Sequence, residues 1–89
     1  MAEERREQYR LQIDLPVLYK VSDHPAIQKA VTYDISDSGI ALYTYAGYKK
    51  GTRLHVTLQG IFDSPKACTV VYSSQKYGVL HKIGARFLE

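Results

Sequence analysis

Residues 11–21 decide the fold class: they read Leu-Gln-Ile-Asp-Leu-Pro-Val-Leu-Tyr-Lys-Val, with an apolar residue at every odd-numbered position. An apolar residue at every second position over such a length predicts a long β-strand with one buried face. Pro16 and Leu18 fall on the outward set. Because proline has no N–H to donate, Pro16 is expected at a sheet edge or at a bulge.

The rest of the chain repeats this pattern in short segments separated by turns. The expected turns, rich in Gly, Pro, Asp and Ser, are residues 22–25, 34–39, 47–51, 60–65 and 73–78. The apolar faces between them are expected to be Ile27, Val31, Tyr33 and Ile35; residues 39–45 on both faces; Leu54, Val56 and Leu58; Cys68, Val70 and Tyr72; and Val79, Ile83, Ala85 and Phe87. No segment shows a helical spacing over three turns. The sequence therefore predicts an all-β fold of six antiparallel strands, and a small barrel is favoured over a sandwich because closure removes exposed sheet edges.

Length and composition limit the classes of protein that fit. The chain has 89 residues, 45% of them hydrophobic, with Lys+Arg 12 against Asp+Glu 9 and a net charge of +3, which suits one small globular domain. No apolar run is long enough to span a membrane, and no secretory signal opens the chain. A single cysteine excludes an internal disulfide framework, so a cytoplasmic protein is expected. Residues 1–10, which hold mainly charged side chains, are expected to form a flexible arm before one domain over residues 11–89.

The side chains that usually carry catalysis or bind metals are scattered. His24, His55 and His81 fall on different predicted elements without metal-ligand spacing. Cys68 lies on the apolar face of a strand, where a small buried hydrophobe is the usual reading. No glycine-rich loop opens onto a helix, and no carboxylates are paired. We therefore predict no enzymatic activity, no metal and no cofactor.

Two short motifs stand out in the chain. Arg6-x-x-x-Arg10, preceded directly by Arg5, comes just before the first strand, and residues 34–39 read Asp-x-Ser-x-x-Gly. Each motif alone is typical of a solvated charged segment or of an ordinary turn. Together, in this order on a six-stranded pattern, they resemble the PilZ domain family of cyclic di-GMP receptors. The resemblance spans nearly the whole chain, through residues 15–17 to residues 83–87, and both motifs are complete.

The resemblance implies a role for each motif residue. Arg6 and Arg10 would grip the Hoogsteen edge of guanine and the phosphates, because a planar guanidinium can donate two parallel hydrogen bonds. Asp34 would accept hydrogen bonds from guanine N1–H and N2–H, and Ser36 would add a hydroxyl contact. Gly39 would let the backbone turn sharply and leave room for the ligand.

Two further residues extend this expected site. An arginine at the position of Arg5 favours an intercalated pair of cyclic di-GMP molecules, because a third cation offsets four closely packed phosphate charges. Tyr72 is a weaker candidate for stacking near the ligand, and a core tyrosine with a hydrogen-bonded hydroxyl is the commoner reading of its position.

A binding module without catalysis has to act by changing shape. The arm is expected to become ordered when cyclic di-GMP binds and then to present a new surface to a downstream protein or an adjacent domain of unknown identity. This reading implies a bacterial signalling protein with no nucleic-acid partner. Two alternatives stay open: a single-strand nucleic-acid-binding barrel that uses its eight tyrosines, and a PilZ-like adaptor that contacts proteins without binding a nucleotide.

Overall fold

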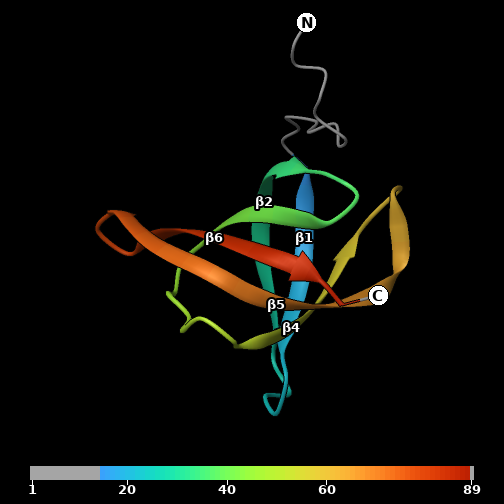
Figure 1. The fold of residues 1–89 in the computed structure, drawn as a ribbon, viewed down its shortest axis with the longest axis horizontal. Helices are drawn as coiled ribbons and strands as arrows, with labels where there is room; N and C mark the ends of the chain where they lie inside the picture. Colours follow the sequence, from blue (N-terminus) through green and yellow to red (C-terminus); the bar gives the residue numbers. More distant parts are fainter. Residues whose placement is uncertain (1–14, 89) are drawn as a thin grey trace, which may run out of the picture.

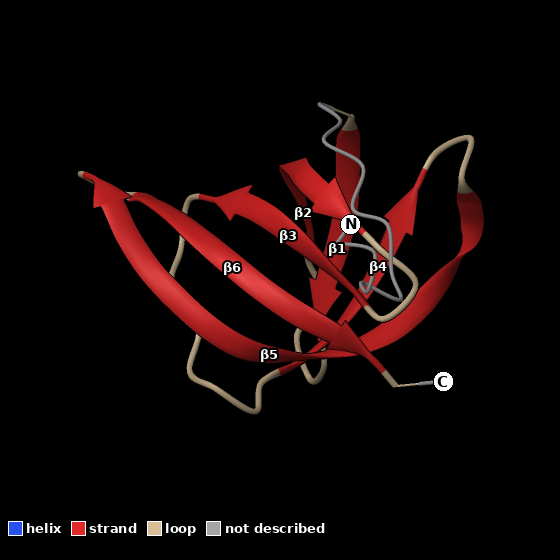
Figure 2. Cartoon of the chain, turned by 45° about the horizontal axis from the view of Figure 1, so that its top comes forward, coloured by secondary structure: helices blue, strands red, loops and turns tan. Residues whose placement is uncertain are grey.

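The computed structural model describes residues 15–88, which form six antiparallel strands and no helix (Figure 1). The strands are β1 (Pro16–Val21), β2 (Ile27–Ile35), β3 (Gly39–Thr44), β4 (Arg53–Leu58), β5 (Phe62–Tyr77) and β6 (Leu80–Phe87). They close into a barrel in the order β1-β2-β3-β6-β5-β4 (Figure 2). The predicted all-β fold and the preference for a barrel over a sandwich are confirmed. The expected flexible arm at residues 1–10 and the expected strand start at residues 11–14 lie outside the described residues.

The core follows from strict alternation on β1 and β4. Val17 and Tyr19 on β1 are buried, and Leu54, Val56 and Leu58 on β4 are fully buried, as the sequence pattern predicts. Leu18, between the two buried β1 residues, is exposed. Burying one apolar face of each strand inside a closed wall is what stabilises so small a domain.

The two prolines at strand positions are accommodated in different ways. Pro16 is the first residue of β1 and pairs with Val31 of β2, so the expected sheet edge does not exist in this closed barrel. The first position of a strand tolerates a missing N–H. Pro65 lies inside β5, in the irregular stretch between the Val56–Lys66 and Leu58–Phe62 pairs, where regular ladder bonding is interrupted.

Two of the predicted turns are shorter in the structure than in the sequence analysis. β5 starts at Phe62 and continues to Tyr77, so the turns expected at residues 60–65 and 73–78 are largely strand. Gly78, with a φ of 53°, lies in the turn that connects β5 to β6. The resulting hairpin extends past the rest of the barrel, at the left of Figures 1 and 2.

The buried face predicted for the strand at residues 27–35 is wrong over most of its length. Ile27 and Val31 are exposed, whereas Ala30 and Thr32 are buried. The register with β1 explains this, because Ala30 pairs with the core residue Val17 and paired residues share a face. The pairing of β2 with β1 therefore decides which face of β2 is buried, although the larger apolar side chains lie on the other face.

Candidate functional site

The Asp-x-Ser-x-x-Gly turn is held in place by backbone hydrogen bonds. The Ser36 N–H donates to the Gly39 carbonyl at 2.9 Å, and the Phe87 N–H of β6 donates to the Ser38 carbonyl at 2.8 Å. Gly39 does not have the positive φ expected of a sharp turn. Instead, a Cβ at this position would collide with the backbone carbonyl oxygen of Ala85. Gly39 is therefore needed for the close approach of β3 to β6, and its predicted role of leaving room for a ligand stays a prediction.

A β-bulge in β2 turns Asp34 onto the outer face of the barrel. Thr32 pairs with the core residue Leu42, Asp34 pairs with Ala41, and Tyr33 is the extra residue between them. One extra residue shifts the alternation by one, so Asp34 shares the outer face with Ala41 rather than the core with Thr32. The Asp34 side chain is nevertheless only 8% exposed, because it lies within a hollow of that face.

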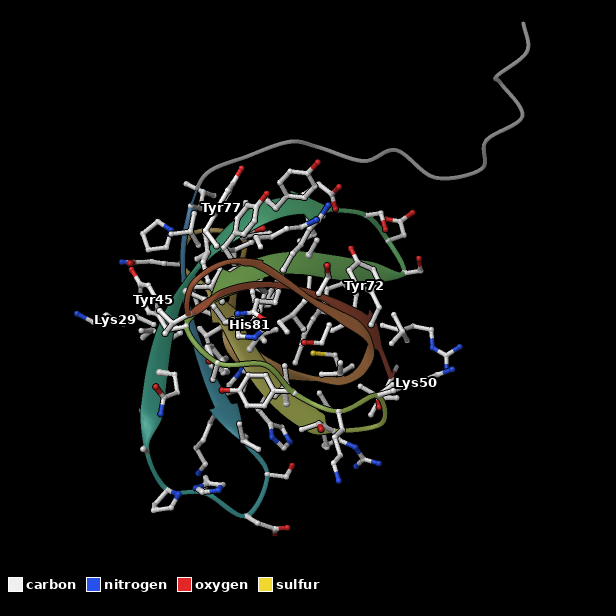
Figure 3. All side chains as sticks on the ribbon, turned by 90° about the vertical axis from the view of Figure 1, so that its left-hand side faces the viewer. Lys29, Tyr45, Lys50, Tyr72, Tyr77 and His81 are labelled. Atoms are coloured by element: carbon white, nitrogen blue, oxygen red, sulfur yellow. The ribbon has the colours of Figure 1, made fainter. Side chains whose placement is uncertain are left out.

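A second bulge, in β5, does the same for Tyr72. Val70 pairs with the core residue Ala85, Tyr72 pairs with Gly84, and Val71 is the extra residue. The Tyr72 side chain is 45% exposed (Figure 3), so the reading of Tyr72 as a core tyrosine is wrong. Its ring lies against Gly84, where any Cβ would collide with it. The missing side chain of Gly84 thus leaves the space that the Tyr72 ring occupies.

These two bulges frame one hollow of about 220 Å³. The strand registers place Asp34, Ala41, Gly84 and Tyr72 in one row across β2, β3, β6 and β5. The small residues in the middle form the floor, and the carboxylate and the phenol ring stand at the two ends. The row beside it holds Gly39 and its partner Arg86, which also line the hollow. A carboxylate, a planar aromatic ring and a guanidinium around a flat floor suit a planar, hydrogen-bonding ligand such as a base.

The structure brings together half of the predicted site. Asp34, Ser36 and Gly39 line the same hollow. Arg5, Arg6 and Arg10 lie outside the described residues, so their part in the site stays a prediction. Tyr72, Gly84 and Arg86 also line the hollow. Of these, the sequence indicated only Tyr72, as a weaker candidate. The one available signal was Gly84 itself, because a glycine inside a strand marks a close approach.

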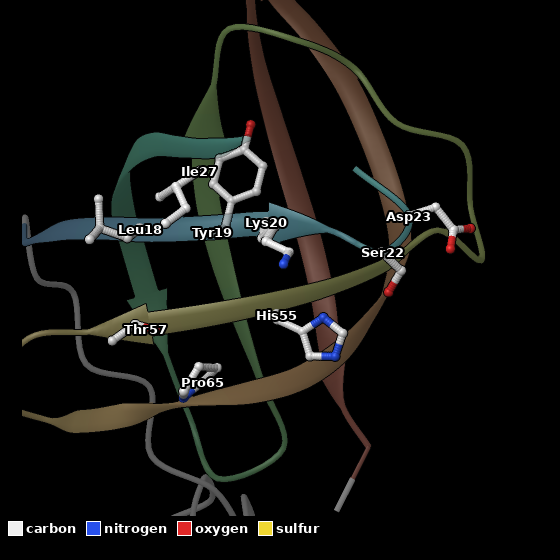
Figure 4. A pocket seen from close by; sticks show the side chains of 9 residues that line it. All are labelled: Leu18, Tyr19, Lys20, Ser22, Asp23, Ile27, His55, Thr57 and Pro65. Carbon is white, nitrogen blue, oxygen red and sulfur yellow. The ribbon is translucent and has the colours of Figure 1, made fainter. Parts of the chain in front are cut away.

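A wider groove lies on the outer face of β1, β2 and β4 (Figure 4). Its volume is about 660 Å³, and Leu18, Ile27 and Pro65 contribute to a mainly apolar lining. Of the predicted site residues that the structure describes, Asp34, Ser36 and Gly39, none lines it. The smaller hollow, in contrast, holds the motif residues Asp34, Ser36 and Gly39.

The other chemical groups of the described barrel do not form a second centre. Among residues 15–88, no three His, Cys, Asp or Glu side chains come together as metal ligands. Cys68 is fully buried, and burial raises the pKa of its thiol to about 11, which disfavours the reactive thiolate. The Tyr19 hydroxyl is 2.8 Å from that of Tyr48, and burial followed by this hydrogen bond raises the pKa of Tyr19.

Comparison with known proteins gives one family and a set of similar folds. The family model described as "PilZ domain" matches residues 4–89. Among solved structures, the PilZ domain with c-di-GMP of YcgR from Escherichia coli is similar with a TM-score of 0.71 and 15% identity, covering 96% of this chain and 79% of that one. The inhibitor of motility MotI/DgrA from Bacillus subtilis is similar with a TM-score of 0.67 and 20% identity, and the 96% of this chain that aligns spans only 43% of that protein.

Two further observations complete the comparison. Among curated proteins, no sequence matches the chain. Within the part of the chain that the structure describes, there is no helix with the length and apolar character needed to cross a membrane.

Proposed function

The chain belongs to the PilZ domain family, and from this membership and the geometry of the hollow we propose that it is a receptor module for cyclic di-GMP. The observation that carries the proposal is the pair of bulges that turn Asp34 and Tyr72 onto one outer face beside Gly39. The similarity to the YcgR domain, which is described with c-di-GMP, supports the choice of ligand.

In the proposed complex, one guanine lies on the floor formed by Ala41 and Gly84. The Asp34 carboxylate accepts hydrogen bonds from guanine N1–H and N2–H, a pair of donors that adenine lacks. The Tyr72 ring stacks on the base, and Ser36 contacts the same base or its phosphate. Stacking on an aromatic side chain contributes about 1–3 kcal/mol per base.

Residues outside the described barrel have to supply most of the positive charge. Among the described residues that line the hollow, Arg86 is the single cation, whereas the ligand carries two phosphodiester charges. Arg6 and Arg10 are proposed to bind the phosphates and the Hoogsteen edge of the base. The Leu15 carbonyl accepts a hydrogen bond from the N–H of Thr32 at 3.0 Å, two residues before Asp34. Arg10 precedes Leu15 by five residues, so an extended chain can carry it about 17 Å from this point.

Ordering of residues 1–10 over the bound nucleotide is the proposed signal. Fixing ten residues costs on the order of 10 kcal/mol of backbone entropy, and charge-assisted contacts from the arginines have to exceed that cost. Because Arg5 adds a third cation, an intercalated pair of nucleotides is the proposed occupancy. Amide hydrogen exchange tests the signal: residues 3–10 are expected to gain protection at saturation with cyclic di-GMP, and unchanged exchange there would rule it out.

Calorimetric titration with cyclic di-GMP tests the binding itself. Saturable binding with a Kd of about 1 μM or tighter is expected, with two nucleotides per chain and far weaker binding of GMP. The Arg6→Ala variant is expected to lose about 2 kcal/mol of binding free energy, because it leaves a ligand phosphate or base edge unpaired. A titration without binding at about 100 μM would reject the proposal.

A nucleotide-independent adaptor is the second candidate function. The similarity to the inhibitor of motility MotI/DgrA favours it. The same titration separates the two candidates, since an adaptor of this kind gives no binding to cyclic di-GMP in a folded chain.

A further inference from the structure

The most exposed aromatic side chains of the described barrel gather outside the hollow. They lie on the outer face of β2, β3 and β6 and at the tip of the β5–β6 hairpin. We name this surface the tyrosine–lysine face, and its members are Lys29, Val31, Tyr33, Tyr43, Tyr45, Tyr77, Val79 and Lys82. None of them lines the hollow at the Asp-x-Ser-x-x-Gly turn, which we call the nucleotide hollow after its proposed ligand.

The strand registers place the centre of this face in one row. Val31 pairs with Tyr43, and Tyr43 pairs with Lys82. The Tyr33 ring lies on the same outer face as Val31, on the other side of the buried Thr32, and packs edge-to-face on Tyr43 with ring centroids 5.4 Å apart. The Lys82 ammonium lies 3.8 Å from the centroid of the Tyr33 ring, well within the range of a cation–π interaction. The centre of the face is therefore a packed, ordered platform.

The margin of the face is open to solvent. Tyr45 is 74% exposed and Tyr77 is 80% exposed. Tyr77 is the last residue of β5, beside the turn into β6, and this hairpin extends past the barrel (Figure 1). Lys29, Tyr45 and Tyr77 lie along one side of the molecule (Figure 3). Tyrosine is enriched among the residues that contribute most to protein interfaces, because its ring is apolar and its hydroxyl hydrogen-bonds.

The charge on the face is positive on balance. Lys29 and Lys82 belong to it, and Lys76 directly precedes Tyr77. Two carboxylates lie at its edges: Asp34 follows Tyr33 in the β2 bulge, and Asp63 lines a groove together with Lys29 and Val31. Three lysines against two edge carboxylates leave a net positive charge, so the face complements a negatively charged surface.

We propose that the tyrosine–lysine face docks an acidic, aromatic- or leucine-bearing segment of a partner protein. Single-stranded nucleic acid fits the face less well. Base stacking requires free ring faces, but Lys82 covers Tyr33, and Tyr33 meets Tyr43 at an interplanar angle of 80°. Exposed Val31 and Val79 add apolar area that suits a protein side chain.

The face also adjoins the nucleotide hollow along the same strands. Lys82 is two residues from Gly84, about 7 Å along β6, and Tyr33 directly precedes Asp34 in the bulge. A bound nucleotide that fixes the side chains of Asp34 and Tyr72 therefore also restricts the neighbouring residues at the edge of the tyrosine–lysine face. This coupling rests on the proposed function, whereas the docking itself does not.

The test is a titration of the ¹⁵N-labelled full chain, followed by NMR, with a synthetic peptide of about twelve residues alternating Asp or Glu with Phe or Leu. Saturable shifts are expected at Tyr45, Tyr77 and Lys82, with affinity falling as salt rises. The double variant Lys29→Glu/Lys82→Glu is expected to bind at least about tenfold more weakly. Lys50→Glu, in the turn before β4, carries the same kind of charge change on the side of the molecule away from Lys29 and Tyr45 (Figure 3), and it is expected to stay within about twofold of wild type.

The outcomes that overturn the inference are specific. Binding weaker than about 1 mM, equal binding of a peptide with Lys in place of the acids, or tighter binding of oligo-dT on the same residues would each reject an acidic protein partner. Asp34→Ala separates this inference from the proposed function, because it is expected to weaken cyclic di-GMP binding by about 30-fold or more and to leave peptide affinity within about twofold.

Discussion

The barrel wall carries two hollows that differ in size and in chemistry. The groove over β1, β2 and β4 has a volume of about 660 Å³ and is lined mainly by apolar atoms. The hollow at the Asp-x-Ser-x-x-Gly turn has about a third of that volume but holds a buried carboxylate, a phenol ring and a guanidinium. Volume therefore points to the groove, whereas the motif residues point to the smaller hollow.

The two hollows also differ in how the backbone makes them. On β1 the groove follows from regular alternation, which leaves Leu18 on the outside; only Pro65, on its β5 side, lies in an irregular stretch. The motif hollow depends on irregularities: one bulge in β2, one in β5, and close approaches at Gly39 and Gly84. Each irregularity loses regular pairing or packing without adding to the core. Such local departures are expected where a protein binds a ligand.

The largest expected effect separates two aspartates of the same turn. Asp34→Ala is expected to weaken cyclic di-GMP binding by about 30-fold or more, near 2 kcal/mol, because the guanine donors lose a charged acceptor. Asp37→Ala, in the same turn but exposed and outside the hollow, is expected to change the affinity by less than about twofold. Calorimetric titration of both variants measures the difference, and equal losses would show that the turn acts only through its total charge.

The fold was predictable because most strands alternate without interruption. Leu54, Val56 and Leu58 point inward as their spacing indicates, and polar turn residues separate such segments. The motif hollow was only partly predictable, because a bulge adds one residue without a clear sequence mark. Alternation therefore placed Tyr72 on an apolar face with Cys68 and Val70. The register with Val17, which buries Ala30, is likewise a tertiary property.

A smaller effect tests whether the position of the Tyr72 ring depends on the missing side chain of Gly84. Tyr72→Ala is expected to weaken cyclic di-GMP binding by about 1–2 kcal/mol through lost stacking. Gly84→Ala is expected to cost nearly as much, since the added Cβ displaces the ring. In the Tyr72→Ala background, Gly84→Ala should then have little further effect on affinity.

The double-mutant cycle is read by calorimetry, with thermal unfolding of each variant as a check on folding. Additive losses of binding free energy from Tyr72→Ala and Gly84→Ala would show that the Tyr72 ring does not depend on Gly84, because the effects of independent sites add. The same result would weaken the contrast between the motif hollow and the groove, whose floor needs no such glycine.

An alkaline titration tests whether one cooperative core holds both hollows. The pKa of the Cys68 thiol rises from its ordinary 9.0 to about 11 in the folded chain, so the unfolded chain ionises first. The stabilisation from this group is complete below pH 9 and is lost as the pH rises toward 11. Between pH 9 and pH 10 the loss is about 1 kcal/mol.

Urea unfolding at a series of pH values measures this loss, and Cys68→Ala supplies the control. The variant starts less stable, because it leaves a cavity in the core, but its stability is expected to fall less between pH 9 and pH 10. Tyr19, whose pKa is also raised by burial, contributes the part that remains. An identical pH dependence in the variant would mean that the thiol is solvated in the folded chain.

The smallest expected effect comes from the groove. Leu18→Thr introduces a β-branched strand former at an exposed position, so the free energy of unfolding is expected to change by no more than about 0.5 kcal/mol. Cyclic di-GMP affinity should stay within about twofold, because Leu18 lies on β1, on the wall of the barrel opposite β6 and its Gly84. A tenfold loss of affinity in a normally folded variant would instead place part of the ligand in the apolar groove. The hollow and the groove would then be two halves of a single binding site.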